Sequence, residues 1–165
     1  MVINVHKLMP IENNEDFKRL YTEYFRSIIK NETNEKWHNI LSILGLSKCE
    51  AYADAMINKI QNGERIGFVF IDGYIYKGLI TGRIYEDVGW ISHLYVKSEL
   101  DSAEQRFIAN QLYKEIALEF KRMGKDKIQT EVSKSEKEFI DTLINLGFKE
   151  STRLEEETSI YEKRI

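Results

Sequence analysis

The sequence predicts a single α+β domain with about seven strands and several helices. Its 165 residues suit one compact domain, since a chain of this size buries roughly two thirds of the surface that it exposes when unfolded. Along the chain, the hydrophobic pattern changes from helical spacing to strand-like runs and back. No repeat, linker or low-complexity tract interrupts it, so we expect one domain over residues 1–165.

The composition is that of a soluble globular protein, with 42% hydrophobic and 31% charged residues. The net charge is -3, and Lys and Arg are scattered, so no nucleic-acid partner is expected. No apolar run approaches the roughly 20 residues of a membrane span, so no membrane partner is expected either. The apolar run at the N-terminus is too short for a signal peptide, which makes the cytoplasm the expected location.

Cysteine and histidine are scarce. The single cysteine, Cys49, excludes an internal disulfide. His6 and His38 have no ligand partners at the spacing of a metal site, so no metal is expected.

The first part of the chain is predicted to be mostly helical. A short strand over residues 2–8 ends at Pro10. Apolar residues at helical spacing then predict an amphipathic helix over about 14–30, a second over about 37–44, and a third that Ser47 caps and Asn62-Gly63 ends.

The middle of the chain predicts an antiparallel meander. Strand-like runs over residues 65–71, 74–85 and 90–96 are separated by short turns, of which Asp72-Gly73 is the strongest signal. Gly78 and Gly82 interrupt the second run, which indicates a bulge or a close approach of another segment.

A long helix over residues 103–123 follows the meander. Ile108, Leu112, Ile116 and Phe120 share one face at i, i+4 spacing, and Gly124 ends the helix. The chain then continues through a strand, a helix and two strands, over residues 127–132, about 135–146, 149–154 and 158–164.

This order of elements, with Leu94-Tyr95-Val96 before the long helix and Leu146-Gly147-Phe148 after the last one, resembles the GNAT superfamily of N-acetyltransferases. The resemblance is best from about Gly63 onwards. It implies a three-layer α/β/α fold, in which helices cover both faces of a mixed, mostly antiparallel sheet. It also implies an enzyme that moves an acetyl group from acetyl-CoA, its co-substrate, to the primary amine of a small molecule or a peptide by direct attack.

The resemblance also implies where acetyl-CoA would bind. The backbone of Leu94, Tyr95 and Val96 would hold its pantetheine arm. Counting back from Gly124 by the spacing of the family places its pyrophosphate loop, Arg/Gln-x-x-Gly-x-Gly/Ala, at residues 104–109. The cofactor-binding residues expected there are Gln105, Arg106, Phe107, Ile108 and Ala109.

Several positions depart from the family pattern: Glu104 and Phe107 in the loop, and Glu136, Phe139 and Leu143 in the last helix. Phe107 replaces the glycine that lets a backbone approach a phosphate. Leu143 stands where many members carry a Tyr that protonates the departing thiolate, so a general acid must come from elsewhere, Tyr95 and Tyr113 being candidates, or from water. The departures at Phe107 and Leu143 favour an alternative: a GNAT-like domain without catalysis that serves as a CoA-binding, regulatory or protein-binding module.

His93 is the expected catalytic residue. It lies beside Leu94 on the strand, near where the resemblance places the group that accepts the proton of the amine, and histidine titrates near neutrality. The other interpretation is a half-buried histidine that is hydrogen-bonded within the sheet. Ser92 and Thr130 are candidates for hydrogen bonds to the substrate. Exposed strand edges near the C-terminus also allow a homodimer.

Overall fold

A computed structural model describes residues 5–7, 15–31, 48–154 and 157–165. Two expectations lie outside these residues: the helix over about 37–44 and the cap at Ser47. The strand expected over residues 2–8 is described only as Val5–Lys7.

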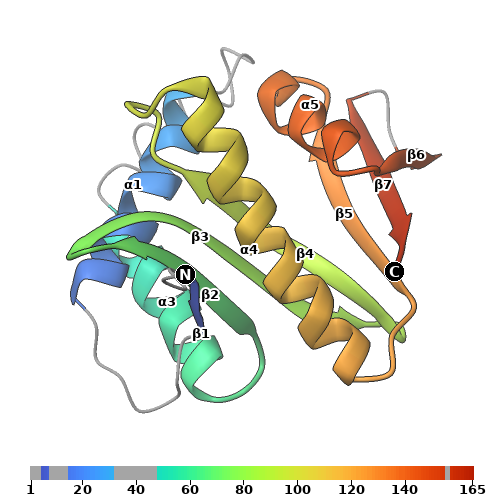
Figure 1. Ribbon diagram of the computed structural model, residues 1–165, viewed down its shortest axis with the longest axis horizontal. Helices are drawn as coiled ribbons and strands as arrows, with labels where there is room; N and C mark the ends of the chain where they lie inside the picture. Colours follow the sequence, from blue (N-terminus) through green and yellow to red (C-terminus); the bar gives the residue numbers. More distant parts are fainter. Residues whose placement is uncertain (1–4, 8–14, 32–47, 155–156) are drawn as a thin grey trace.

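The described strands form one seven-stranded sheet in the order β1-β2-β3-β4-β5-β7-β6 (Figure 1). All neighbours pair antiparallel except β4 and β5, which pair parallel. The strands are β1 (Val5–Lys7), β2 (Ile66–Asp72), β3 (Ile75–Tyr85), β4 (Val88–Val96), β5 (Lys127–Ser133), β6 (Lys149–Arg153) and β7 (Thr158–Arg164).

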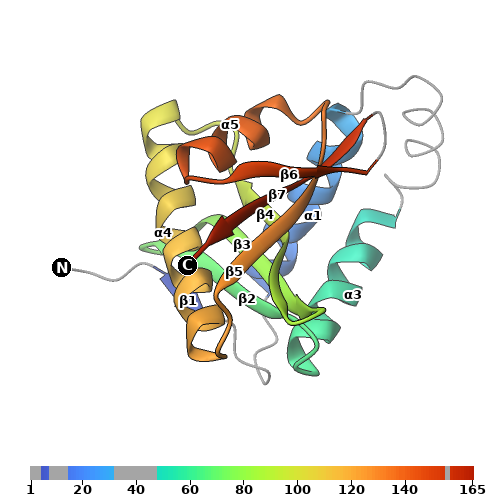
Figure 2. The same ribbon diagram turned by 90° about the vertical axis from the view of Figure 1, so that its right-hand side faces the viewer.

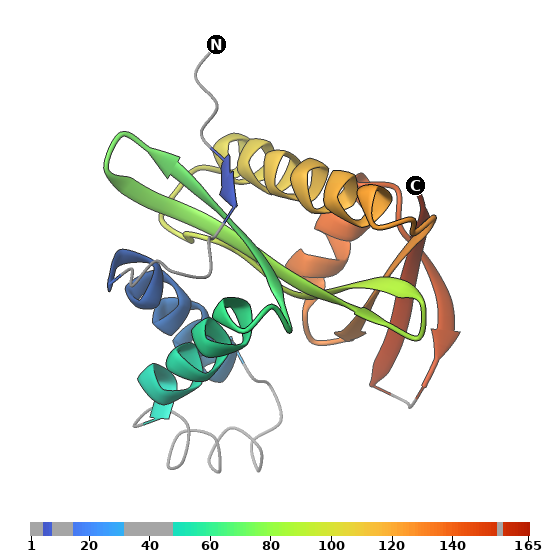
Figure 3. The same cartoon turned by 90° about the horizontal axis from the view of Figure 1, so that it is seen from below.

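Helices lie on both faces of the sheet, which confirms the three-layer prediction. Figure 3 shows α4 and α5 on one face and α1 and α3 on the other. Their bounds are Glu15–Asn31 for α1, Cys49–Gln61 for α3, Ser102–Arg122 for α4 and Lys137–Asn145 for α5. β5, β7 and β6 lie nearest the viewer in Figure 2. None of the helices in the described ranges is long and apolar enough to cross a membrane.

Each face of the sheet carries its own hydrophobic cluster. The apolar stripe of α4 is fully buried, with Ile108, Leu112, Ile116 and Phe120 all 0% exposed, as its i, i+4 spacing predicts. Tyr21 of α1 is also 0% exposed and packs in the second cluster, against β2 and β3. The two clusters fix both helical layers against the strands that carry the site.

Two glycines let α4 lie close to the sheet. A Cβ on Gly82 would lie 2.9 Å from the Ile116 side chain, and one on Gly89 would lie 2.6 Å from the Phe120 ring. Side chains at either position would push the helix away from the strands. The close approach expected at Gly82 is thereby confirmed, and the register between β3 and β4 shifts at the same residue.

The hairpin between β3 and β4 is tighter than the sequence predicts. Tyr85 pairs with Val88, so only Glu86 and Asp87 connect the strands. Both have positive φ, 49° and 65°, as a two-residue hairpin of type I′ requires. β4 therefore begins at Val88, two residues before the expected start.

Candidate functional site

The parallel strands β4 and β5 separate soon after they pair. Backbone pairing is confined to Gly89 with Ile128 and Trp90 with Gln129. The next contact is made by a side chain, because Thr130 Oγ1 donates a hydrogen bond to the Ile91 carbonyl over 3.0 Å. Beyond it, the two strands leave a gap in the middle of the sheet, at the element predicted to hold acetyl-CoA.

A β-bulge in β4 lies at the start of this gap. Thr81 of β3 pairs with His93 and Gly82 pairs with Ile91, so Ser92 is an extra residue without a partner on β3. Bulges re-aim side chains and are frequent next to active sites. This bulge lies where β4 loses its second neighbour.

The backbone of β4 beyond the bulge offers hydrogen-bonding groups to the gap. The N–H of Lys97 donates to the Lys77 carbonyl over 3.0 Å, and alternate residues of an antiparallel strand bond to the same neighbour. Tyr95 therefore directs its N–H and C=O toward β3, and Leu94 and Val96 direct theirs toward the gap. Two of the three residues predicted to hold the pantetheine arm have backbone groups placed for it; the contact itself stays a prediction.

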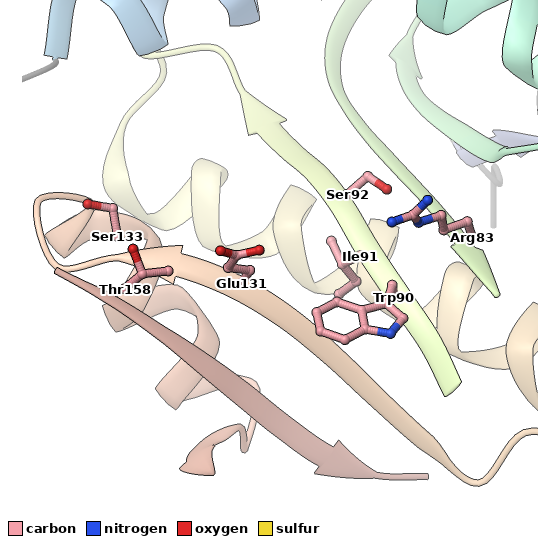
Figure 4. A pocket seen from close by; sticks show the side chains of 7 residues that line it. All are labelled: Arg83, Trp90, Ile91, Ser92, Glu131, Ser133 and Thr158. Atoms are coloured by element: carbon pink, nitrogen blue, oxygen red, sulfur yellow. The ribbon is translucent and has the colours of Figure 1, made fainter. Parts of the chain in front are cut away.

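A cavity of about 380 Å³ lies beside the gap (Figure 4). This volume suits a small molecule. Arg83 and Ser92 lie on one side of it, and Glu131, Ser133 and Thr158 lie on the other. The residues that line it are Arg83, Trp90, Ile91, Ser92, Glu131, Ser133 and Thr158.

Of the two hydroxyl residues expected to bind substrate, the structure places one at the cavity. Ser92 lines it, whereas Thr130 is only 2% exposed and its hydroxyl bonds to the Ile91 carbonyl. Sequence reasoning missed Arg83 and Glu131. The alternation of residues 127–133 separates Glu131 from the buried Val132, but it does not say which strand lies beside it.

His93 lies among aromatic rings on the α1 face of the sheet. Its ring centroid is 4.8 Å from that of Tyr24 and 5.5 Å from those of Tyr21 and Phe25. Its Nδ1 hydrogen-bonds with the Tyr21 hydroxyl, which also contacts Thr81 Oγ1 over 3.0 Å. His93 is not among the residues that line the cavity.

Burial lowers the pKa of His93 from 6.5 to about 4, and the positive charges of Arg65 and Lys59 act in the same direction. The imidazole is therefore neutral at neutral pH and a weak base. The catalytic role of His93 stays a prediction, and its contacts match the other interpretation, a histidine hydrogen-bonded within the fold.

The N-terminus of α4 carries carboxylates. The Asp101 side chain accepts a hydrogen bond from the N–H of Glu104 over 2.8 Å. The Glu104 carboxylate accepts one from Lys77 Nζ over 2.6 Å. A helix N-terminus attracts anions through its unpaired N–H groups, but here Asp101 already supplies a negative charge. A pyrophosphate at this end of α4 would be repelled by that charge.

Residues 104–109, where the pyrophosphate loop is expected, lie inside the first two turns of α4, and the binding of acetyl-CoA there stays a prediction. Asp101 caps the helix, which begins at Ser102, one residue before the predicted start. Ile108 and Ala109 are 0% and 5% exposed and pack within the fold, away from any ligand at the helix start. Residues 97–101 precede the helix instead.

The remaining three loop residues lie on the surface or at the turn into the helix. The Gln105 side chain donates its amide N–H to the Lys97 carbonyl over 3.0 Å. Arg106 is exposed, and Phe107 is 56% exposed with its ring 6.2 Å from that of Phe70. Their contact with acetyl-CoA stays a prediction.

The pKa values of Tyr95 and Tyr113, the two tyrosines considered as proton donors, are both raised further above neutral pH. Burial raises the pKa of Tyr95 to about 12 and that of Tyr113 to about 12. The Tyr113 hydroxyl is buried without a hydrogen-bond partner in the described part of the chain. Leu143 is 0% exposed and packs in the core. No three metal-ligating side chains come together among the residues that the structure describes.

No protein-family model and no curated protein matches the sequence. Solved structures do match. A PaiA N-acetyltransferase from Thermoplasma acidophilum in complex with coenzyme A has a TM-score of 0.76 at 18% identity, with 100% of both chains covered. An acetyltransferase of the GNAT family from Staphylococcus aureus Mu50 has a TM-score of 0.70 at 16% identity, over 97% of this chain and 98% of that one.

An aminoglycoside 6'-acetyltransferase type Ii is similar at a TM-score of 0.69 and 16% identity, over 99% of this chain and 97% of that one. At these identities the likeness shows the fold. The chain has the acyl-CoA N-acyltransferase fold of the GNAT superfamily, as the resemblance in sequence implies.

Proposed function

We propose that this protein is an acetyl-CoA-dependent N-acetyltransferase that moves an acetyl group to a primary amine by direct attack. The separation of β4 and β5 after Trp90 is the observation that carries the proposal. It opens a gap in the sheet beside a polar cavity, so two substrates can meet from opposite faces. The structures with the same fold include acetyltransferases, one of them in complex with coenzyme A.

The gap between β4 and β5 fits the pantetheine arm of acetyl-CoA well. The N-terminus of α4 fits the pyrophosphate less well. Backbone groups of Leu94 and Val96 would position the arm and polarise the thioester carbonyl, as oxyanion donors do. At the other end, Asp101 opposes the phosphates, whereas the Glu104 carboxylate is already paired with Lys77. Arg106 is the cation nearest in sequence that could offset the charge of Asp101.

The acceptor amine would approach from the cavity that Ser92 and Glu131 line. It must lose a proton before it attacks the carbonyl carbon. Glu131 or a water molecule suits that task better than His93, because Glu131 lines the cavity and His93 does not. With Leu143 buried at the position of the usual proton donor, we propose that the departing thiolate takes its proton from water.

A second candidate function is a GNAT-like module without catalysis. It is favoured by Asp101, because its carboxylate caps the helix end to which the phosphates of CoA would have to bind. Such a module would keep the fold and bind a partner or another ligand.

Melting temperatures separate the two candidates. A ligand that binds only the folded chain raises the melting temperature in proportion to the logarithm of its concentration. We expect acetyl-CoA to raise it more than adenosine 3′,5′-bisphosphate, which lacks the pantetheine arm. Thiol release with an added amine then measures transfer. An unchanged melting temperature with acetyl-CoA far above micromolar concentration would contradict the proposed enzyme and favour the module without catalysis.

A further inference from the structure

Two arginines face each other beside the cavity. Ile66 of β2 pairs with Gly82 of β3, so Arg65, just before β2, lies opposite Arg83. Like charges directly opposite on neighbouring strands destabilise a sheet. The pKa of Arg65 is lowered by burial and then by the charge of Arg83. The pair therefore lowers the stability of the free protein.

Neither arginine has an ion-pair partner in the described part of the chain. Tyr21 and then Glu64 raise the pKa of Arg65 against the larger effects of burial and Arg83, and neither forms an ion pair with Arg65 among the described residues. Arg65 Nε and Trp90 Nε1 are both buried without an acceptor among the residues that the structure describes. The Arg83 guanidinium lies 4.8 Å from the centre of the Tyr85 ring. Among the described residues, Arg83 and Trp90 thus bring hydrogen-bond donors without ion-pair or acceptor partners to this end of the cavity, and Arg65 lies behind them on the neighbouring strand.

A carboxylate lies on the other wall. Glu131 of β5 lines the same cavity and is exposed, and it forms no ion pair with the described residues (Figure 4). Arg83 and Glu131 are thus unpaired charges of opposite sign that do not reach each other. Between them lies a volume of about 380 Å³, enough for a molecule of amino-acid size.

We propose that the acceptor is a small zwitterion of the amino-acid class, which carries a carboxylate beside its primary amine. Arg83, backed by the charge of Arg65, would bind the carboxylate, since a guanidinium matches a carboxylate through two parallel hydrogen bonds. Glu131 would bind the ammonium group and hold it toward the gap between β4 and β5. The proposal rests on the proposed function and names its substrate class.

The charges also suit the course of the reaction. The ammonium gives a proton to Glu131 or water, and its nitrogen forms a C–N bond with the acetyl carbon and then loses a second proton to water. The C–S bond breaks, its electron pair stays on sulfur, and the thiolate takes up a proton. The product is an N-acetyl acid with a carboxylate and no ammonium. Glu131 then has no cation to hold, which favours release of the product.

The test compares each standard L-amino acid with its amide, which keeps the amine and lacks the carboxylate. With acetyl-CoA present, we expect kcat/KM for the best acid to exceed that for its amide by about tenfold or more. Arg83→Gln should remove that preference by lowering kcat/KM for the acid alone. Arg164→Gln, on an exposed residue at the far end of β7, is the matched control and should keep it.

A second readout guards against misfolding. Since Arg83→Gln relieves the repulsion with Arg65, the free variant should melt at the wild-type temperature or slightly above it. Equal kcat/KM for amino acids and their amides would overturn the proposal. So would an Arg83→Gln variant that lowers kcat/KM for acids and amides alike, or a wild type that acetylates no amino acid.

Failure of the substrate class and failure of the enzyme are distinguishable. If acetyl-CoA binds and amines without a carboxylate are acetylated best, the protein is an N-acetyltransferase and the proposed amino-acid acceptor is wrong. If acetyl-CoA does not bind, but an amino acid raises the melting temperature of the wild type and not of Arg83→Gln, then the cavity binds amino acids and the proposed acetyl transfer is wrong.

Discussion

The Thr130 hydroxyl donates a hydrogen bond to the Ile91 carbonyl over 3.0 Å at the point where β4 and β5 part. It takes the place of the next backbone bond of a parallel ladder. The bond therefore closes the paired part of the two strands and defines where the gap begins.

Replacing Thr130 by Val should leave the buried carbonyl of Ile91 without a donor at almost unchanged side-chain volume. We expect the free energy of unfolding to fall by roughly 1–3 kcal/mol, the cost of an unsatisfied buried group. Urea unfolding measures it. Thr142→Val is the control, because the Thr142 hydroxyl bonds to the Glu138 carbonyl at an exposed site of α5. Equal losses in both variants would contradict a special role for the bond at the gap.

Asp101→Ser should strengthen the binding of acetyl-CoA. Serine keeps the helix cap and removes the charge, so we expect an affinity gain of about twofold to fivefold at low salt, and a smaller gain at high salt. Calorimetric titration measures it. Asp126→Asn removes an exposed charge beyond the C-terminal end of α4 and should change nothing. An unchanged affinity in Asp101→Ser would place the phosphates away from the helix start.

Stability should fall in mild acid because of His93. Its pKa is lowered from 6.5 to about 4, so between these pH values the unfolded chain binds the proton and the folded chain does not. The contribution is fully present above pH 6.5 and is lost as the pH falls toward 4, by roughly 3 kcal/mol in total.

Urea unfolding across this range, compared with His93→Asn, isolates that contribution from the carboxylates. The variant should lose less stability than the wild type on acidification. His6→Asn, on an exposed residue of β1, should behave as the wild type. A wild type and a His93→Asn variant with parallel pH profiles would show that His93 is solvated.

Gly89→Ala should clash with Phe120, whose ring would lie 2.6 Å from the new Cβ. We expect a loss of about 1–3 kcal/mol from overpacking. Phe120→Leu should relieve part of it, so the double variant should lose less than the sum of the single ones. Gly89→Ala with Ile108→Val, three turns away along α4, should be additive. If the losses of unfolding free energy in Gly89→Ala and Phe120→Leu are additive in the double variant, residues other than Phe120 move to relieve the clash.

Local sequence patterns were sufficient to predict most of the helices and strands. The stripe from Ile108 to Phe120 predicts α4, and the short turns around β3 predict the meander, because both signals lie within a few residues. The helix start was predicted to within one residue, since α4 begins at Ser102 and the predicted helix begins at residue 103. Asp101 followed by Glu104 is a capping pattern that lies in the sequence beside this start.

The cavity could not be predicted in the same way. Arg83 and Glu131 are far apart in the chain, and they share a cavity only because β4 lies between their strands and separates from β5. Which strands are neighbours is a property of the whole sheet. The Tyr21 contact of His93 has the same origin, since it joins α1 to β4 across more than half of the chain.

The alternation of hydrogen bonds along β4 has a consequence for amide hydrogen exchange. A central strand of a sheet ordinarily exchanges slowly throughout. Here the amides of Leu94 and Val96 face the gap and should exchange with solvent deuterium quickly, whereas that of Tyr95 between them should be protected by β3. A ligand that enters the gap would slow the two fast amides and leave the third unchanged, so three neighbouring residues would report its arrival.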